Sequence, residues 1–186
     1  MVLTASNMLP LGTIAPNFGL ADVVSNKIIS LTDFRGYKGL VIMFISHHCP
    51  FVKHIKKELA NIGNDYKNKN LGVIAISSND VINYPDDSPK NLKLMAEQEE
   101  FNFPICYDET QEIAKNYLAA CTPDFYLFDS NFRLVYRGQL DDSRPSLDIP
   151  VTGKDLRNAI DALLTNQPIN IEQKPSIGCN IKWKNN

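Results

Sequence analysis

The chain has 186 residues, of which 44% are hydrophobic and 22% are charged, a composition typical of one globular domain with a sizeable core. The formal net charge of -2 gives no indication of binding to nucleic acid or to an anionic membrane. No apolar run is long enough to span a bilayer, and residues 1–11 lack the basic start and apolar centre of a signal peptide. We therefore expect a single domain over residues 1–186 in the cytoplasm, where cysteines stay reduced.

The first part of the chain predicts a β-hairpin followed by a buried strand. Residues 18–24 and 28–31 are expected to be the two strands of the hairpin, because turn-forming residues at 25–27 separate them. One helical turn is expected at residues 32–36. The apolar run at residues 40–45 has no polar alternation, which is typical of a strand buried on both faces of a parallel sheet.

A long helix is predicted directly after this strand. It is expected to begin at Pro50, since proline fits the first position of a helix, and to run to about residue 67. Apolar residues recur along it at helical spacing, so one face is expected to be buried. Residues 72–77 form a second buried strand. The elements predicted next are a polar, turn-rich segment at 79–87, a helix at 88–99, a short strand at 103–106 and a helix at 110–118.

The last part of the chain predicts a second hairpin, a loop and a final helix. The hairpin strands are residues 125–129 and 133–137, and the helix covers residues 154–164. Between them lies a loop at 141–150, whose charges we expect to face solvent. Residues 165–186 show no periodicity and are expected to pack on the body as a tail. Strands that alternate with helices indicate α/β layers around a mixed sheet.

Cys49 lies where the first buried strand gives way to the long helix. Open α/β sheets place their functional sites at such a carboxyl end of a central strand. A helix N-terminus also carries partial positive charge and free N–H groups, which favour a thiolate over a thiol. The sequence therefore predicts a reactive cysteine at residue 49, although a buried structural cysteine is the alternative.

Three stretches carry a resemblance to known proteins: Gly-Thr-Ile-Ala-Pro-Asn-Phe at 12–18, Ser-His-His-Cys-Pro at 46–50 and Thr-Pro-Asp-Phe at 122–125. They resemble the alkyl hydroperoxide reductase/thiol-specific antioxidant group and the membrane-tethered thiol-disulfide reductases. The resemblance implies an α/β thioredoxin fold, in which helices flank a central mixed sheet, with an N-terminal β-hairpin extension and an insertion after the second core strand. Similarity to a bacterial thioredoxin-family subgroup is carried by residues 48–54, 108–111, 136–144 and 178–183.

The chain departs from the motifs of this group in two ways. Ser46 stands where thioredoxin-like reductases have the first cysteine of Cys-x-x-Cys, so the dithiol cycle of that motif cannot run. Ser46 and Cys49 have the hydroxyl-to-cysteine spacing of the peroxiredoxin motif Pro-x-x-x-Thr-x-x-Cys, but Ile42 replaces its proline. Where peroxiredoxins supply an arginine, the chain has Pro123, which the resemblance implies is a cis-proline.

The resemblance implies roles for a small set of residues. Cys49 would be the catalytic thiol, and Ser46 would hydrogen-bond its thiolate, unless it is an ordinary serine at a strand end. Cys179 is a candidate resolving thiol, with a tail cysteine packed against Trp183 as the alternative. The histidines beside Cys49 lack a second cluster at ligand spacing, so we expect neither a metal nor another cofactor. Residues expected to line a substrate groove are His47, His48, Thr122 and Pro123.

Two hypotheses of function follow. In the first, the chain is a thiol-dependent oxidoreductase with antioxidant character, in which Cys49 attacks a small peroxide or a protein or low-molecular-weight disulfide. An external thiol would act as the reductant. In the second, the chain is a redox-inactive binding module that holds a peptide or a partner thiol at the cis-proline groove. The sequence does not indicate the oligomeric state.

Overall fold

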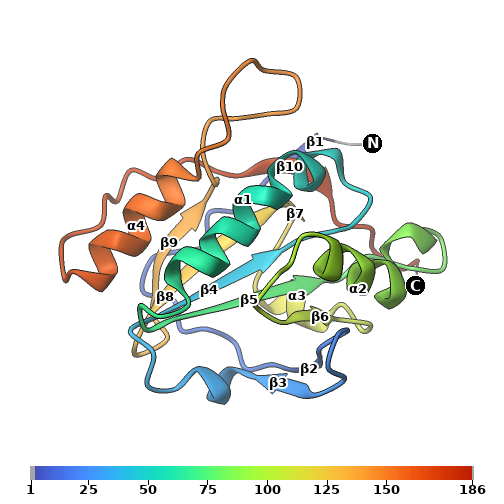
Figure 1. Ribbon diagram of the computed structural model, residues 1–186, viewed down its shortest axis with the longest axis horizontal. Coiled ribbons are helices and arrows are strands. Elements are labelled where there is room, and N and C mark those ends of the chain that lie inside the picture. The colour runs from blue at the N-terminus through green and yellow to red at the C-terminus, as the bar shows by residue number, and fades with distance from the viewer. Residues whose placement is uncertain (1–2, 186) are drawn as a thin grey trace.

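A five-stranded mixed sheet forms the centre of the molecule in the computed structural model, which describes residues 3–185 (Figure 1). Strands β4 and β5 are parallel, as are β5 and β6, whereas β8 is antiparallel to both β4 and β9. This arrangement confirms the predicted mixed sheet and the thioredoxin fold. Its strands, in spatial order, are β6 (Ile105–Tyr107), β5 (Leu71–Ser77), β4 (Gly39–Phe44), β8 (Asp124–Asp129) and β9 (Leu134–Gly138).

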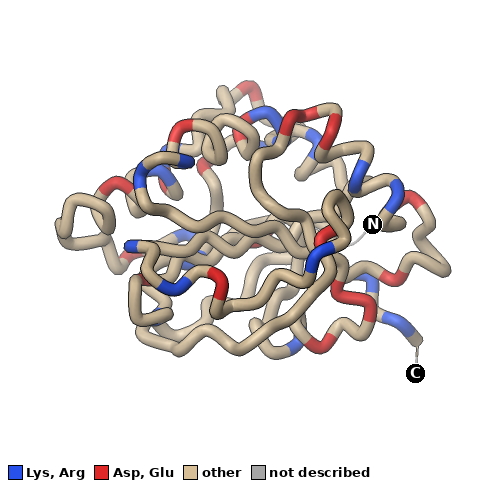
Figure 2. Tube along the Cα trace, turned by 60° about the horizontal axis from the view of Figure 1, so that its bottom comes forward, with Lys and Arg blue, Asp and Glu red and all other residues tan. Residues whose placement is uncertain are grey.

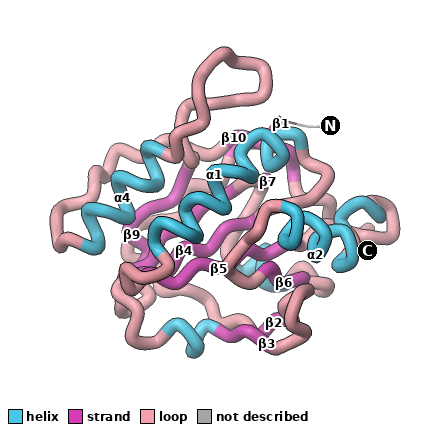
Figure 3. Tube along the Cα trace, viewed as in Figure 1, coloured by secondary structure: helices cyan, strands magenta, loops and turns pink. Residues whose placement is uncertain are grey.

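Helices cover both faces of this sheet (Figures 1 and 3). Every residue of β4 is buried, because its alternate side chains pack into two different hydrophobic clusters. Val41 and Met43 pack on the face that carries the three longer helices, and Ile42 and Phe44 pack on the opposite face. The longer helices are α1 (Pro50–Tyr66), α2 (Pro89–Gln98) and α4 (Lys154–Leu164), and the opposite face is covered by the short helices η1 (Leu31–Phe34) and α3 (Glu112–Asn116).

The two additions to the core fold are also present. The N-terminal hairpin consists of β2 (Gly19–Ala21) and β3 (Ile28–Ser30), which are shorter than predicted. The insertion after β5 contains η2 (Pro85–Asp87) and α2. Helix α3 is also shorter than the predicted span of 110–118, because Gln111 adopts a left-handed conformation with φ of 64° and the helix begins only after it.

A second, three-stranded antiparallel sheet was not predicted. It contains β1 (Leu3–Ala5), β10 (Ile177–Asn180) and β7 (Cys121–Thr122), with β10 in the middle. The tail at 165–186, which was expected to pack on the body and for which no strand was predicted, therefore contributes the central strand. In this register Cys179 lies opposite Thr122, directly before Pro123.

The charged residues lie mainly on helices and loops, where both signs alternate, and the central strands carry few of them (Figure 2). Strands β4 and β5 contain no charged residue at all. Within residues 3–185, none of the helices is long and apolar enough to cross a membrane.

Candidate functional site

Cys49 is the residue that immediately precedes helix α1. Its backbone is extended, with φ of -66° and ψ of 121°, and Pro50 is the first helical residue. The carbonyl oxygen of Cys49 accepts the N–H of Lys53 at 2.9 Å, so the helical hydrogen bonds begin at this residue. The side chain is completely buried in the hydrophobic cluster beneath α1. Cys49 therefore lies at the helix start, as the sequence predicts, but it is shielded from solvent.

The Cys49 sulfur is in contact with two neighbours that the three-stranded sheet brings to it. Its Sγ lies 3.2 Å from the carbonyl oxygen of Thr122 and 2.8 Å from the Sγ of Cys179. A disulfide bond joins sulfurs about 2.05 Å apart, so a small displacement would close the pair. Both cysteines are buried. The structure thus brings together two cysteines that are 130 positions apart in the chain.

The surroundings of Cys179 keep its thiol protonated. Burial, and then the neighbouring Cys49, raise the pKa of the Cys179 thiol to about 12. Cys179 therefore keeps its proton at neutral pH. Because thiolates, rather than thiols, are the nucleophiles, Cys179 is not suited to make the first attack on an oxidant.

Ser46 and Pro123 lie beside the cysteine pair. The peptide bond between Thr122 and Pro123 is cis, which confirms the conformation that the resemblance implies. The Ser46 hydroxyl is buried and lies 3.3 Å from the hydroxyl of Thr122. The expected partner of Ser46 was the Cys49 sulfur, so the structure directs this hydroxyl to the cis-proline strand instead. A catalytic role for Ser46 stays a prediction.

The two histidines before Cys49 point into different surroundings. His48 donates its backbone N–H to Oδ1 of Asp87 at 3.0 Å, and its Nδ1 lies 2.5 Å from Oδ2 of the same carboxylate. The His48 ring also stacks on Tyr84, with centroids 5.8 Å apart. Nδ1 of His47 is buried and has no hydrogen-bond partner within the described residues. In the same part of the chain, residues 3–185, no group of three or more candidate metal ligands occurs.

The loop between β9 and α4, which projects from the body in Figure 1, borders this site. We expected its charges to face solvent, but Asp141 is buried, because its carboxylate accepts the N–H groups of Thr152 and Gly153 at 2.7 Å each. That expectation was wrong for Asp141. A recess of about 20 Å³ separates this loop from α1, and its lining includes His54, Pro123 and Arg144.

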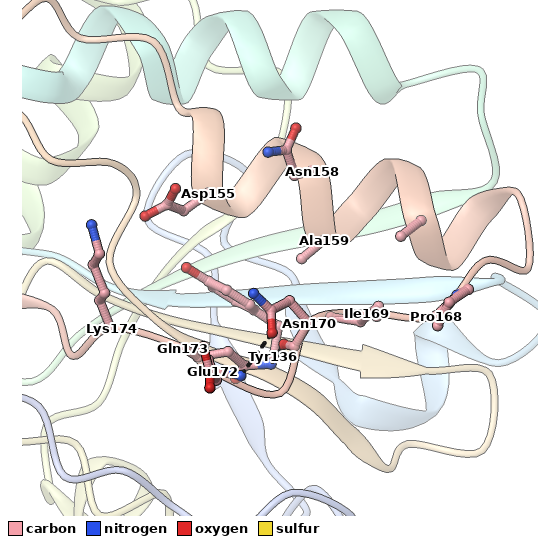
Figure 4. Close-up of a pocket in the computed structure, with 11 residues that line it drawn as sticks. Tyr136, Asp155, Asn158, Ala159, Pro168, Ile169, Asn170, Glu172, Gln173 and Lys174 are labelled. Carbon is pink, nitrogen blue, oxygen red and sulfur yellow. Dashed lines mark hydrogen bonds between the residues drawn. The ribbon is translucent and has the colours of Figure 1, made fainter.

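A larger cleft lies elsewhere, between α4, β9 and residues 168–174 (Figure 4). Its volume is about 360 Å³, and Asp155 and Asn158 of α4 face Asn170 and Gln173 of the tail across it. None of the predicted site residues lines this cleft. The candidate site is therefore the buried junction of the five-stranded and three-stranded sheets rather than this cleft.

One residue of this junction, Asp87, was not predicted from the sequence. Asp87 is fully buried and lies in the segment that was predicted only as polar and turn-rich. Its contact with His48 joins residues 39 positions apart. No local pattern marks such a contact, because it depends on how the insertion folds back on the strand-to-helix junction.

Comparison with protein families places this geometry in context. Residues 11–137 match the model of the AhpC/TSA family. Peroxiredoxin Bcp of Escherichia coli (strain K12) is 29% identical over 111 residues, which make up 60% of this chain and 65% of that protein. The chain thus matches less than two thirds of the length of this curated relative.

Solved structures show the same fold. An uncharacterized conserved protein from Geobacillus kaustophilus is 54% identical, with a TM-score of 0.98 over 100% of this chain and 98% of its own. A hypothetical protein from Sinorhizobium meliloti 1021 is 43% identical, with a TM-score of 0.96 over 98% and 100%. The thioredoxin domain of a thiol-disulfide oxidoreductase from Bacteroides vulgatus is 19% identical, with a TM-score of 0.65 over 84% and 99%, and shows likeness of fold alone.

Proposed function

The chain belongs to the AhpC/TSA family, and from this premise we propose that it is a thiol-dependent oxidoreductase that reduces small hydroperoxides with Cys49 and Cys179 as its two thiols. The observation that carries the proposal is the 2.8 Å contact between the two sulfurs. The contact gives Cys49 a partner thiol from Cys179. The Cys-x-x-Cys motif would otherwise supply that partner from residue 46, which is a serine in this chain.

The reaction consists of two steps and a reduction. Cys49, as thiolate, attacks the terminal oxygen of the hydroperoxide, the O–O bond breaks, and the leaving alkoxide takes a proton to become an alcohol. The Cys49 sulfenic acid then reacts with the Cys179 thiol, which forms the disulfide and releases water. Two equivalents of an external thiol reduce this disulfide and are themselves joined as a disulfide.

Burial of the pair favours a small oxidant over a protein disulfide. Cys49 is 0% exposed and Cys179 is 1% exposed, so a folded protein cannot bring a disulfide to either sulfur in this conformation. A hydroperoxide group contains only two oxygen atoms and needs far less space. Small disulfides remain the second class of oxidant to be tested, because thiol-disulfide exchange needs the same thiolate.

The alternative function, a binding module without redox activity, is not favoured. Its main motivation was the loss of the first motif cysteine at Ser46. A partner sulfur in contact with Cys49 removes that motivation, because an intramolecular disulfide can form without residue 46.

The proposal is tested by intact-mass analysis after addition of one equivalent of hydrogen peroxide. We expect the wild type to lose two hydrogens, with peptide mapping that joins Cys49 to Cys179. Cys179→Ser should instead gain one oxygen, as a sulfenic acid that dimedone traps, and Cys49→Ser should not react. Cys106→Ser is the matched control, because that buried cysteine lies against the carbonyl oxygen of Leu20, away from the pair, and it should react like the wild type.

Turnover is measured as peroxide consumption with dithiothreitol, and disulfide reduction is measured with glutathione disulfide in a parallel series. Peroxide turnover by Cys49→Ser at the wild-type rate would contradict the proposal. A wild type that exchanges only with glutathione disulfide would limit the activity to disulfide reduction.

A further inference from the structure

Asp87 occupies a buried position between the two halves of the site. We propose that Asp87, acting with Asn79, is a positioning residue that holds the Cys49 junction and the Cys179 strand in register for disulfide formation. This inference rests on the proposed function, since it concerns the same pair of sulfurs. The hydrogen bonds that Asp87 and Asn79 make join them to each other, to His48 and to Lys182, and not to the sulfur of Cys49 or Cys179.

Asp87 binds the Cys49 side of the site through His48. Asp87 ends the short helix η2 of the insertion, and its side chain is fully buried. One carboxylate oxygen accepts the backbone N–H of His48, and the other meets Nδ1 of the His48 ring. The peptide group directly before Cys49 is thus held by a carboxylate from a different part of the chain.

Asn79 links Asp87 to the Cys179 side of the site. The Asn79 amide donates to Oδ2 of Asp87 at 2.6 Å, and its oxygen accepts the backbone N–H of Lys182 at 2.8 Å. Lys182 follows Cys179 by three residues and lies two residues beyond the end of β10. Its carbonyl oxygen accepts the N–H of Asp80 at 2.8 Å, so both backbone groups of Lys182 are bound to the insertion.

These contacts form one continuous path from His48 through Asp87 and Asn79 to Lys182. Asn79 is 2% exposed and Asp87 is 0% exposed, so water cannot replace the partners of either side chain. Burial alone would raise the pKa of the Asp87 carboxyl, yet hydrogen bonds from His48 and Asn79 hold that pKa below its ordinary value. The side chain is therefore a carboxylate at neutral pH, and hydrogen bonds to a charged acceptor are the stronger kind.

Register matters because the reaction of two thiols depends on their effective concentration. Groups held in a reactive geometry reach effective molarities far above those of freely moving groups, and small displacements lower them steeply. Strand β10 pairs with only two residues of β7, so this pairing by itself offers little restraint along the strand. Beside the pairing with β1 and the bond from the N–H of Ile181 to the carbonyl oxygen of Ala120, the Asp87–Asn79 path supplies a further restraint close to Cys179.

The test uses Asp87→Asn, which keeps the shape of the side chain and removes its charge, and Asn79→Ala, which removes the link to Lys182. Asp108→Asn is the matched control: Asp108 is equally buried and accepts hydrogen bonds from Ser78 and Ala114, but it contacts neither His48 nor Lys182. Each full-length protein is equilibrated with glutathione redox buffers, and the fraction of Cys49–Cys179 disulfide is measured by mass after alkylation.

We expect the equilibrium constant for the disulfide to fall at least tenfold in Asp87→Asn and in Asn79→Ala, and to stay within twofold of wild type in Asp108→Asn. A residue that merely stabilises the fold would change the unfolding midpoint and leave this equilibrium unaltered in the folded protein. The first step can be measured alone in a Cys179→Ser background, where Cys49 stops at the sulfenic acid. Addition of Asn79→Ala to that background should leave the rate of sulfenic acid formation unchanged.

Two failures can be told apart. A wild type that forms no Cys49–Cys179 disulfide with peroxide or with glutathione disulfide overturns the proposed function, and the positioning role with it. A wild type that forms the disulfide while Asn79→Ala and Asp87→Asn match it overturns only the positioning role. If Asp87→Asn does not fold, the result for Asn79→Ala decides alone.

Discussion

The five-stranded sheet and the three-stranded sheet of this protein are held together by different means. Every residue of β4 and β5 is buried, and side chains from both strands pack into the hydrophobic clusters on the two faces of the central sheet. In the three-stranded sheet, β1 has no buried residue and β7 is only two residues long. Backbone pairing and buried polar contacts must therefore hold the smaller sheet, which nevertheless delivers Cys179 to the site.

Apolar packing is therefore concentrated in the central sheet, whereas the cysteine pair depends on both sheets. The central sheet buries a cluster of aromatic rings, in which Phe44 lies 5.8 Å from Tyr117 and 5.9 Å from Tyr126 between ring centroids. The cysteine pair lies at the seam between the two sheets, with Cys49 from one and Cys179 from the other. Three perturbations would separate the contributions of the two regions.

The largest effect is expected from Phe44→Ala in the central sheet. Phe44 is 1% exposed, so the substitution leaves a cavity between rings that cannot close without rearranging β4 and β8. We expect a loss of about 3–5 kcal/mol in the free energy of unfolding. Urea denaturation followed by circular dichroism measures it, and a loss below about 1 kcal/mol would mean that this cluster does not dominate stability.

A smaller loss of stability, but a larger loss of chemistry, is expected from Gly178→Ala in β10. A Cβ atom at residue 178 would collide with the carbonyl oxygen of Thr122, so β10 must move away from β7. We expect a cost of about 1–3 kcal/mol, typical of overpacking, together with at least a tenfold slower formation of the Cys49–Cys179 disulfide.

The control for this substitution is Gly19→Ala in β2, where the nearest atom to the new Cβ is Cγ2 of Ile28 at 3.8 Å, an ordinary contact. Disulfide formation in Gly19→Ala should match the wild type. Equal rates in both alanine variants would show that the register of β10 does not govern the reaction.

The smallest effect concerns the pH dependence of stability at the seam. Burial alone would raise the pKa of Asp87, but its hydrogen bonds with His48 and Asn79 lower it below the value of about 3.9 for an unfolded aspartate. A lowered pKa stabilises the fold above the unfolded pKa, and this contribution is lost as pH falls through the folded pKa. The stability difference between wild type and Asp87→Asn should therefore narrow as the pH falls below the unfolded pKa of about 3.9, which urea titrations at each pH would measure. A difference that is constant over this range would show that the charge of Asp87 contributes nothing.

The central sheet was predictable because its signals are local. The apolar run at 40–45 and Pro50 lie next to each other in the sequence, so they locate both a buried strand and the position of Cys49 without knowledge of any distant residue. The resemblance, rather than a local signal, correctly predicted that Pro123 is a cis-proline.

The smaller sheet was not predictable for a physical reason. Its strands have two to four residues, and their backbone groups pair with segments far away in sequence, such as Leu3 with Cys179. Such pairing imposes no alternation that a short window of sequence reveals. Asp87 escaped notice for the same reason, since its function in the fold depends on the distant His48.

The sequence separation of the cysteine pair has a consequence during protein synthesis. A ribosome releases the chain from its N-terminus, so Cys49 emerges 130 residues before Cys179. Until the last of these residues leaves the exit tunnel, no Cys179 thiol is present to capture a sulfenic acid at residue 49. If the proposed function holds, a sulfenic acid formed at residue 49 in this interval has no intramolecular thiol to react with, and a second equivalent of peroxide would oxidise it to the sulfinic acid, which thiols do not reverse.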